Sequence, residues 1–242
     1  LIASAAGATV VKHGNKTNTR KSGSAEALQA LGVNIEIDVA KVEQTLEKVR
    51  LCFCYAIKHH PAMRFAGPIR KELAIPTIFN VLGPLTNPGG VLNQLLGVAS
   101  KQWTTTMASV LQRLGSERAV VVHGADGLCE LTTTADTYVT ELREGTLREY
   151  TLRPQELGFA QGNLAEIQIS SPQESATIIQ NILEGVGGTA RDVAVLNTAG
   201  ALIVAGIVDD FQSGIQQAIE TIDSGKAKKK LADLIEYTKE GS

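Results

Sequence analysis

The sequence has few aromatic residues and little net charge. Aromatic side chains make up 4% of the 242 residues, and the formal net charge is −2. So small a charge excludes a global basic field that would attract nucleic acid or an anionic membrane. The chain also lacks any run of about 18 apolar residues, so we expect no membrane-spanning segment.

Cysteine is equally scarce. Cys52, Cys54 and Cys129 are odd in number and lack the paired spacing of a zinc site. Free thiols are typical of reducing compartments, so we expect a cytoplasmic protein without disulfides. The chain starts at Leu1 with no charged segment ahead of an apolar core, which argues against a secretory signal and suggests a fragment of a longer protein.

Small and branched apolar residues are plentiful instead. Hydrophobic residues make up 43% of the chain, which is long enough to bury a full core. Strand patterns at 94–98 and 118–123 flank a helix pattern at 104–114, which predicts a parallel βαβ unit. Residues 137–152 predict an antiparallel hairpin that turns at Glu144-Gly145. The expected fold class is therefore α/β.

The other expected elements are mostly helices. We expect a strand at 165–169, and a basic helix face from Lys226 to Leu231 that is solvated. A helix with Pro68 in its first turn is expected at 68–73. Further helices are predicted at 25–32, 39–50, 175–183, 193–205 and 211–224. No linker divides the chain, so a single domain over residues 1–242 is expected.

The most informative stretch runs from Lys12 to Ala25. An apolar run delivers the chain into a loop that is rich in donors, and a helix pattern follows. Free N–H groups and the helix dipole favour anions at such a junction, and Gly14 and Gly23 let a ligand approach the backbone. An ordinary solvated loop with a capped helix explains the same residues equally well.

A second abrupt change of polarity lies at residues 53–64. The segment is apolar first and then polar, through His59 and His60 to Arg64. This pattern predicts a buried strand that opens into a loop at its carboxyl end, which is the edge where open α/β sheets bind ligands.

Four motifs resemble those of the anthranilate phosphoribosyltransferases. They are Lys12-His13-Gly14-Asn15, Ser22-Gly23-Ser24-Ala25, His60-Pro61-Ala62-Met63-Arg64 and the segment Phe79 to Pro88. The likeness is collinear over essentially the whole chain, down to Asn197-Thr198-Ala199-Gly200 and Ile222-Asp223-Ser224-Gly225.

The resemblance implies a fold and a reaction. The fold would be a nucleoside phosphorylase/phosphoribosyltransferase-like catalytic domain, with a central, mostly parallel sheet flanked by helices. The enzyme would transfer phosphoribose from 5-phosphoribosyl-1-pyrophosphate to anthranilate with Mg²⁺, in the second step of tryptophan biosynthesis. The full-length protein would be a homodimer. Catalysis would come from positioning and charge neutralisation.

Carried over by position, the resemblance also implies site residues. Asn15 would hydrogen-bond anthranilate with His13 beside it, Arg70 would meet its carboxylate, and His60 would line the same channel. The residues that would hold the donor's phosphates are Lys12, Gly14, Thr19, Arg20 and Ser24.

Each of these residues also has a purely structural interpretation. His13 and His60 could be ordinary loop histidines, and Asn15 could serve turn geometry. Arg70 could pair with Glu72 or Glu26 on the surface. The collinear set of motifs favours the functional interpretation for Lys12, Asn15 and Arg70.

Three departures from the family pattern keep other functions open. The glycine-rich phosphate loop and the Asn-x-Ser-Thr segment would precede Leu1, and without them the chain could fold yet be inactive. The metal-binding Asp-Glu pair corresponds to Cys129-Glu130, and a thiol suits Mg²⁺ poorly. Thr19-Arg20 replaces two serines, while Ile57 and His59 replace Pro and Tyr. The alternatives are a paralogue with another acceptor, a phosphorolytic enzyme and a non-catalytic binding protein.

Overall fold

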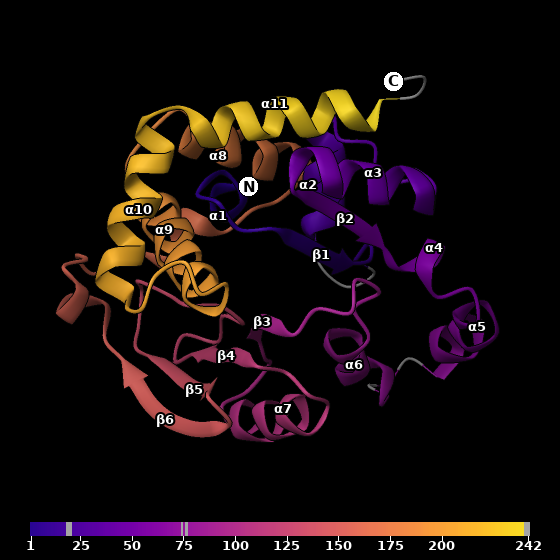
Figure 1. Ribbon diagram of the computed structural model, residues 1–242, viewed down its shortest axis with the longest axis horizontal. Helices are drawn as coiled ribbons and strands as arrows, with labels where there is room; N and C mark the ends of the chain where they lie inside the picture. The colour runs from indigo at the N-terminus through magenta and orange to yellow at the C-terminus, as the bar shows by residue number, and fades with distance from the viewer. Residues whose placement is uncertain (18–20, 74, 76, 240–242) are drawn as a thin grey trace. The chain divides into compact units, whose positions relative to one another are not determined.

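The computed structural model describes residues 1–17, 21–73, 75 and 77–239, with only the backbone of Pro68, Arg70, Lys71 and Asn80 (Figure 1). The residues group into two compact units. Unit 1 comprises Leu1–Ala8, Val91–Gln168 and Ile178–Lys230, and unit 2 comprises Thr9–Gly90, Ile169–Thr177 and Leu231–Ser242. A single domain over the whole chain stays a prediction.

Unit 1 is built on a four-stranded sheet with the order β3-β4-β5-β6. The strands are β3 (Asn93–Gly97), β4 (Arg118–Gly124), β5 (Thr137–Arg143) and β6 (Thr146–Leu152). β3 and β4 are parallel, and α7 (Gln102–Arg113) connects them and packs on β4 and β5. The predicted βαβ unit is thus confirmed.

The predicted hairpin is also confirmed. β5 and β6 are antiparallel, with Arg143 opposite Thr146. Glu144 and Gly145 have φ values of 51° and 71°. Positive φ at both central residues is the two-residue turn that matches the twist of the flanking strands.

Helices complete unit 1. α9 (Thr189–Val204) contacts β3 and β4, and α10 (Phe211–Asp223) packs on α9. A Cβ on Gly214 of α10 would lie 2.8 Å from the Ala199 backbone, so glycine permits this close helix contact. The other elements of unit 1 are α1 (Ile2–Ala5) and the 3₁₀ turns η2 (Pro154–Leu157) and η3 (Leu164–Ile167).

Unit 2 contains a parallel pair of strands, β1 (Val10–Gly14) and β2 (Leu51–Tyr55), with Gly14 opposite Tyr55. Every residue of β2 is buried, and α3 (Val39–Val49) packs on it. The remaining elements of unit 2 are α2 (Ser24–Ala30), α4 (Ala56–His59), α5 (Met63–Leu73), α6 (Phe79–Leu82) and the 3₁₀ turn η1 (Gly83–Leu85). Because both strands run the same way, their carboxyl ends share one edge of the sheet.

Two helices, α8 (Pro172–Leu183) and α11 (Lys226–Thr238), contribute residues to both units. Across the residues described, no helix is long and apolar enough to span a lipid bilayer. The thiols of Cys52, Cys54 and Cys129 are free, as expected.

Three local predictions are wrong. The strand expected at 165–169 is the 3₁₀ turn η3, whose first turn is capped by the Asn163 side chain through Ala165 N at 3.0 Å. The helix expected to begin near Pro68 begins at Met63, so Pro68 lies inside it. The polar residues after β2 form the helical turn α4 instead of a loop. The α/β class and the other predicted helices are confirmed.

Candidate active site

The carboxyl ends of β1 and β2 bring two of the predicted site residues together. His13 lies near the end of β1, and His60 follows α4 directly after β2. Their Nε2 atoms are 3.1 Å apart, and the ring planes meet at 67°. Lys12 and His13 belong to the strand, so the polar loop begins at Asn15 rather than at Lys12 as expected.

Two histidines at this edge, His13 and His59, have lowered pKa values. Burial lowers the pKa of His13, and the nearby His60 lowers it further, against an opposing hydrogen bond with the Gly83 backbone. Burial also lowers the pKa of His59, again with a contribution from His60. At neutral pH, His13 is therefore an uncharged imidazole whose hydrogen-bond partners are His60 and the Gly83 backbone.

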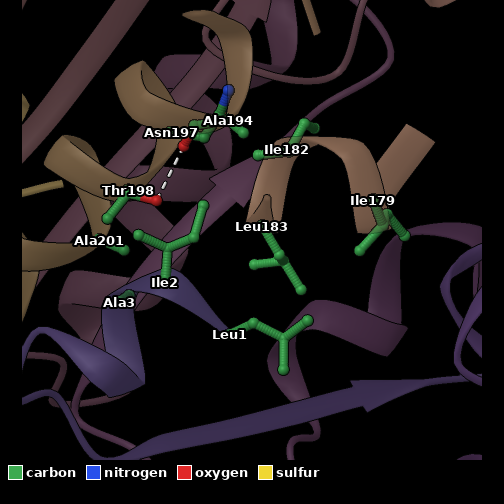
Figure 2. A pocket seen from close by; sticks show the side chains of 10 residues that line it. All are labelled: Leu1, Ile2, Ala3, Ile179, Ile182, Leu183, Ala194, Asn197, Thr198 and Ala201. Atoms are coloured by element: carbon green, nitrogen blue, oxygen red, sulfur yellow. Dashed lines mark hydrogen bonds between the residues drawn. The ribbon is translucent and has the colours of Figure 1, made fainter. Parts of the chain in front are cut away.

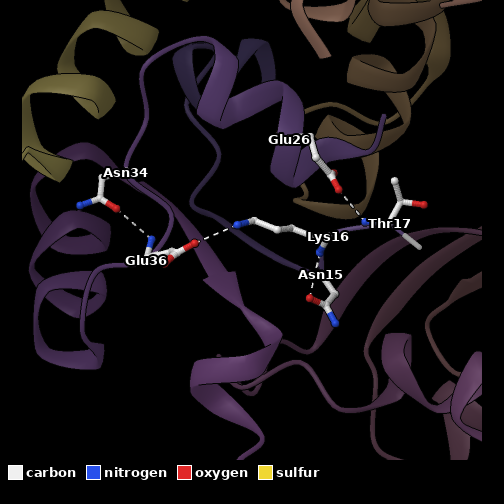
Figure 3. A network of polar contacts seen from close by, with 6 residues as sticks. All are labelled: Asn15, Lys16, Thr17, Glu26, Asn34 and Glu36. Atoms are coloured by element: carbon white, nitrogen blue, oxygen red, sulfur yellow. Dashed lines mark hydrogen bonds and ion pairs between the residues drawn. The ribbon is translucent and has the colours of Figure 1, made fainter. Parts of the chain in front are cut away.

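The residues after β1 are held by Asn15 and by two glutamates from elsewhere in unit 2, Glu26 and Glu36 (Figure 3). Asn15 Oδ1 accepts a hydrogen bond from Lys16 N at 2.8 Å, which fixes the side chain against its own backbone. Lys16 Nζ pairs with Glu36 Oε1 at 2.8 Å and lies 5.6 Å from the Tyr55 ring centre. Glu36 raises the pKa of Lys16 through this hydrogen bond.

Glu26 on α2 connects the two ends of the following segment. Its Oε1 accepts a hydrogen bond from Thr17 N at 2.7 Å, and its Oε2 accepts one from Gly23 N at 3.1 Å. The Gly23 contact is one half of a capping box, whereas the Thr17 contact reaches nine residues back along the chain. The sequence signals only half of this role, because a glutamate three residues after a helix N-cap indicates a capping box but not the contact with Thr17.

Asn87, which belongs to the motif at Phe79 to Pro88, makes two hydrogen bonds. Its Nδ2 donates to Val11 O at 3.1 Å, and its Oδ1 accepts from Gly89 N at 2.9 Å. A Cβ on Gly89 would lie 2.8 Å from Val11 Cγ1. Asn87 and Gly89 thus fasten the turn after η1 to β1, one residue before Lys12.

The other predicted binding residues are placed only in part. Ser24 is the first residue of α2 and is exposed, as is Lys12 on β1. Arg70 lies within α5, but its side chain is outside the described part of the chain, as are Thr19 and Arg20 altogether.

The predicted metal position lies in unit 1, in the loop after β4. Asp126 organises this loop, because its carboxylate accepts hydrogen bonds from Leu128 N at 3.0 Å, Thr132 Oγ1 at 2.7 Å and Thr134 Oγ1. Burial raises the pKa of Asp126, but these hydrogen bonds outweigh it and lower the pKa overall. Both carboxylate oxygens are thus engaged within the loop, which argues against Asp126 substituting for a metal ligand.

Close packing fixes the same loop from two further sides. A Cβ on Gly97 would lie 1.6 Å from the Cys129 carbonyl oxygen, so only glycine permits β3 to approach the loop. Asn197 on α9 donates to Leu131 O at 2.6 Å and accepts from Leu131 N at 3.1 Å. The backbone around Cys129 and Glu130 is therefore held in one conformation.

The residues in this loop do not fit Mg²⁺ as a pair. Mg²⁺ prefers hard oxygen ligands in octahedral geometry, and Cys129 offers a soft sulfur. Glu130 supplies one suitable carboxylate. Within the described ranges, no three His, Cys, Asp or Glu side chains gather as a metal site. A metal here would depend on oxygens that a ligand brings.

A pocket of about 300 Å³ lies elsewhere in unit 1 (Figure 2). It is mostly apolar, and its two polar side chains are already hydrogen-bonded. Thr198 Oγ1 donates to Ala194 O at 2.8 Å, and Asn197 bonds to Leu131 and donates through Nδ2 to Val193 O at 2.8 Å. Such a lining offers no cation for a phosphate or a carboxylate, so the pocket is not part of the candidate site. Its lining residues are Leu1, Ile2, Ala3, Ile179, Ile182, Leu183, Ala194, Asn197, Thr198 and Ala201.

A match to a protein family identifies the class of protein to which the chain belongs. Residues 1–228 match the family described as "Glycosyl transferase family, a/b domain". The chain is 45% identical over 235 residues to an anthranilate phosphoribosyltransferase of Rhodospirillum rubrum, covering 97% of this chain and 68% of that protein.

Solved structures agree with the sequence relatives. The crystal structure of anthranilate phosphoribosyltransferase from Thermus thermophilus is similar with a TM-score of 0.91 and 36% identity, covering 98% of this chain and 70% of that one. The Saccharomyces cerevisiae enzyme, solved in complex with PRPP and Mg, has a TM-score of 0.87 and 28% identity, with 98% and 68% covered. The chain therefore belongs to the anthranilate phosphoribosyltransferase family.

Proposed function

We propose that this protein transfers the 5-phosphoribosyl group from 5-phosphoribosyl-1-pyrophosphate to the amine of anthranilate, releasing pyrophosphate. This is the second step of tryptophan biosynthesis. Family membership supports the reaction, and the observation that carries it is the convergence of Asn15 and the His13–His60 pair at the carboxyl ends of β1 and β2. Ligands of open α/β sheets bind at this edge.

The proposed roles follow from the chemistry of each group. The amine attacks C1 of the ribose as the bond to pyrophosphate breaks, so the protein must position both substrates and balance the leaving charge. Lys12 and the segment through Ser24 supply charge and N–H donors for the donor's phosphates. Arg70 supplies a planar pair of donors for the anthranilate carboxylate. Neutral His13 and the Asn15 amide border the acceptor without adding charge.

Magnesium enters the proposal through the donor's diphosphate. A bound Mg²⁺ would neutralise the charge of the leaving pyrophosphate. Of the two residues at the predicted metal position, Glu130 is the fitting ligand and Cys129 is not.

We also propose that the protein forms a homodimer in the cytoplasm. The resemblance to the family supports this proposal for the full-length protein. Light scattering at rising concentration should show a dimer, and a monomeric mass at every concentration would contradict the proposal.

Turnover tests the reaction directly. Loss of anthranilate fluorescence should require 5-phosphoribosyl-1-pyrophosphate and Mg²⁺ together. Donor binding without turnover of anthranilate would favour another acceptor, and absence of both would favour a non-catalytic protein, which Cys129 would then help to explain.

Arg70→Ala separates the two substrates. We expect the KM for anthranilate to rise about thirtyfold, because a charge-assisted contact is worth roughly 2 kcal/mol. The KM for the donor should stay within about twofold. An equal loss for both substrates would contradict the role assigned to Arg70.

A further inference from the structure

Glu26 is a negative charge at an unexpected place. It lies on α2, at the end of the segment proposed to bind the donor's phosphates, where a carboxylate should repel an anion. Its two oxygens do not face away from that segment. They accept hydrogen bonds from Thr17 N at 2.7 Å and from Gly23 N at 3.1 Å, at the segment's two ends.

We propose that Glu26 is a positioning residue for phosphoribosyl-donor binding, acting as a brace that fixes Thr17 relative to Gly23. The inference rests on the proposed function and names a residue that acts through the backbone rather than by touching the donor. A single carboxylate shared by two N–H groups sets the distance between them, because each oxygen is bound to the same carbon.

The surroundings of Glu26 support a purpose-built contact. A Cβ on Gly23 would lie 3.1 Å from Glu26 Oε2 and 3.6 Å from Thr17 Cβ, so glycine at this position keeps the carboxylate close to both ends. Directly ahead of Thr17, Lys16 is held by Glu36 at 2.8 Å. The Glu26 contact with Thr17 therefore comes directly after Lys16, the residue that Glu36 holds.

Two physical roles for Glu26 predict opposite results. If its charge alone mattered, removing the charge would tighten donor binding. If it is a brace, removing it frees the segment ends, and the donor must then order them at a cost in binding. Gln at this position keeps one acceptor oxygen but places an amide N–H against the second backbone donor.

The test compares Glu26→Ala and Glu26→Gln with Asp38→Ala. Asp38 is a matched control in the same unit, because its carboxylate caps α3 by accepting from Lys41 N at 2.7 Å but joins no distant segment. We expect Glu26→Ala to raise the donor KM at least tenfold and Glu26→Gln to raise it by less. In both, the anthranilate KM should stay within twofold. Asp38→Ala should lower Tm while both KM values hold.

Amide hydrogen exchange gives a readout that is independent of activity. In Glu26→Ala, the Thr17 and Gly23 amides should exchange at least tenfold faster, while the Lys41 amide should be unchanged. Tighter donor binding in Glu26→Gln, or unchanged donor KM and exchange in Glu26→Ala, would overturn the inference. A wild-type protein without turnover would instead overturn the proposed function, and the exchange rates would still decide whether the brace exists.

Discussion

The segment after β1 and the loop after β4 are each organised by one carboxylate, but the donors differ. Asp126 accepts two threonine hydroxyls and one backbone N–H from within its own loop. Among the described residues, Glu26 accepts hydrogen bonds from two backbone N–H groups, three and nine residues away. The hydrogen bonds of Asp126 thus use two side chains of its own loop, whereas the two hydrogen bonds of Glu26 use backbone N–H groups of the segment and none of its side chains.

We expect the largest loss of stability when the hydrogen bonds of Asp126, in the loop after β4, are removed. Asp126→Ala removes a carboxylate that satisfies three donors, and charged hydrogen-bond acceptors of this kind contribute strongly. We expect the free energy of unfolding in urea to fall by about 3 kcal/mol. The matched variant Asp210→Ala, which removes the N-cap of α10, should cost about 1 kcal/mol.

The pH dependence of Asp126 sharpens the same prediction. Its pKa is lower in the folded state than in the unfolded chain. Its contribution should therefore be complete above the unfolded pKa of about 3.9 and be lost as the pH falls through the lowered folded value. An Asp126→Ala protein as stable as the wild type at neutral pH would refute the difference drawn between the two regions.

A smaller effect is expected from Cys129→Asp in the same loop. An oxygen ligand in place of sulfur should raise Mg²⁺ affinity about tenfold, or about 1.4 kcal/mol, measured by calorimetry in the presence of pyrophosphate. Stability should change little, because the loop is held by Asp126 and Asn197 rather than by this side chain. Unchanged metal affinity would mean that position 129 is not a ligand position.

The smallest effect concerns His13, near the carboxyl end of β1. Burial lowers the folded-state pKa of His13, so the unfolded chain binds the proton more readily. His13's contribution to stability should be full above the unfolded pKa of about 6.5 and decline as the pH falls toward the lowered folded value. His13→Gln should flatten the pH dependence of Tm between pH 7 and pH 5. An unchanged slope would contradict the burial of His13 beside His60.

Much of the fold could be predicted because local sequence patterns were enough to indicate its helices and strands. The βαβ unit, the Glu144-Gly145 hairpin and α3 each have a periodicity or turn that needs no tertiary partner. The failures lie where tertiary contacts override local signals. Residues 165–169 alternate apolar and polar side chains like a strand, but η3 covers Leu164–Ile167, and Glu166 accepts a hydrogen bond from Thr189 on α9 at 2.8 Å.

The site was predictable in its residue types and less so in its contacts. The motifs pointed to His13 and His60, and the two-strand edge explains why residues so far apart in sequence meet. The sequence could not reveal that Asp126 is engaged by Thr132 and Thr134, because that contact depends on how the loop folds back. Glu26 was missed because a capping residue and a brace look the same in sequence.

The most direct test is calorimetric titration with 5-phosphoribosyl-1-pyrophosphate and Mg²⁺. We compare the wild type with two variants. Lys12→Ala changes β1 in unit 2, and Lys101→Ala changes unit 1, where Lys101 Nζ lies 4.0 Å from the Tyr138 ring centre. The account predicts that the wild type binds the donor, that Lys12→Ala weakens binding about tenfold by removing one charged contact, and that Lys101→Ala binds as the wild type does. Equal affinity of Lys12→Ala and the wild type would contradict the claim that Lys12, at the carboxyl end of β1, helps to hold the donor.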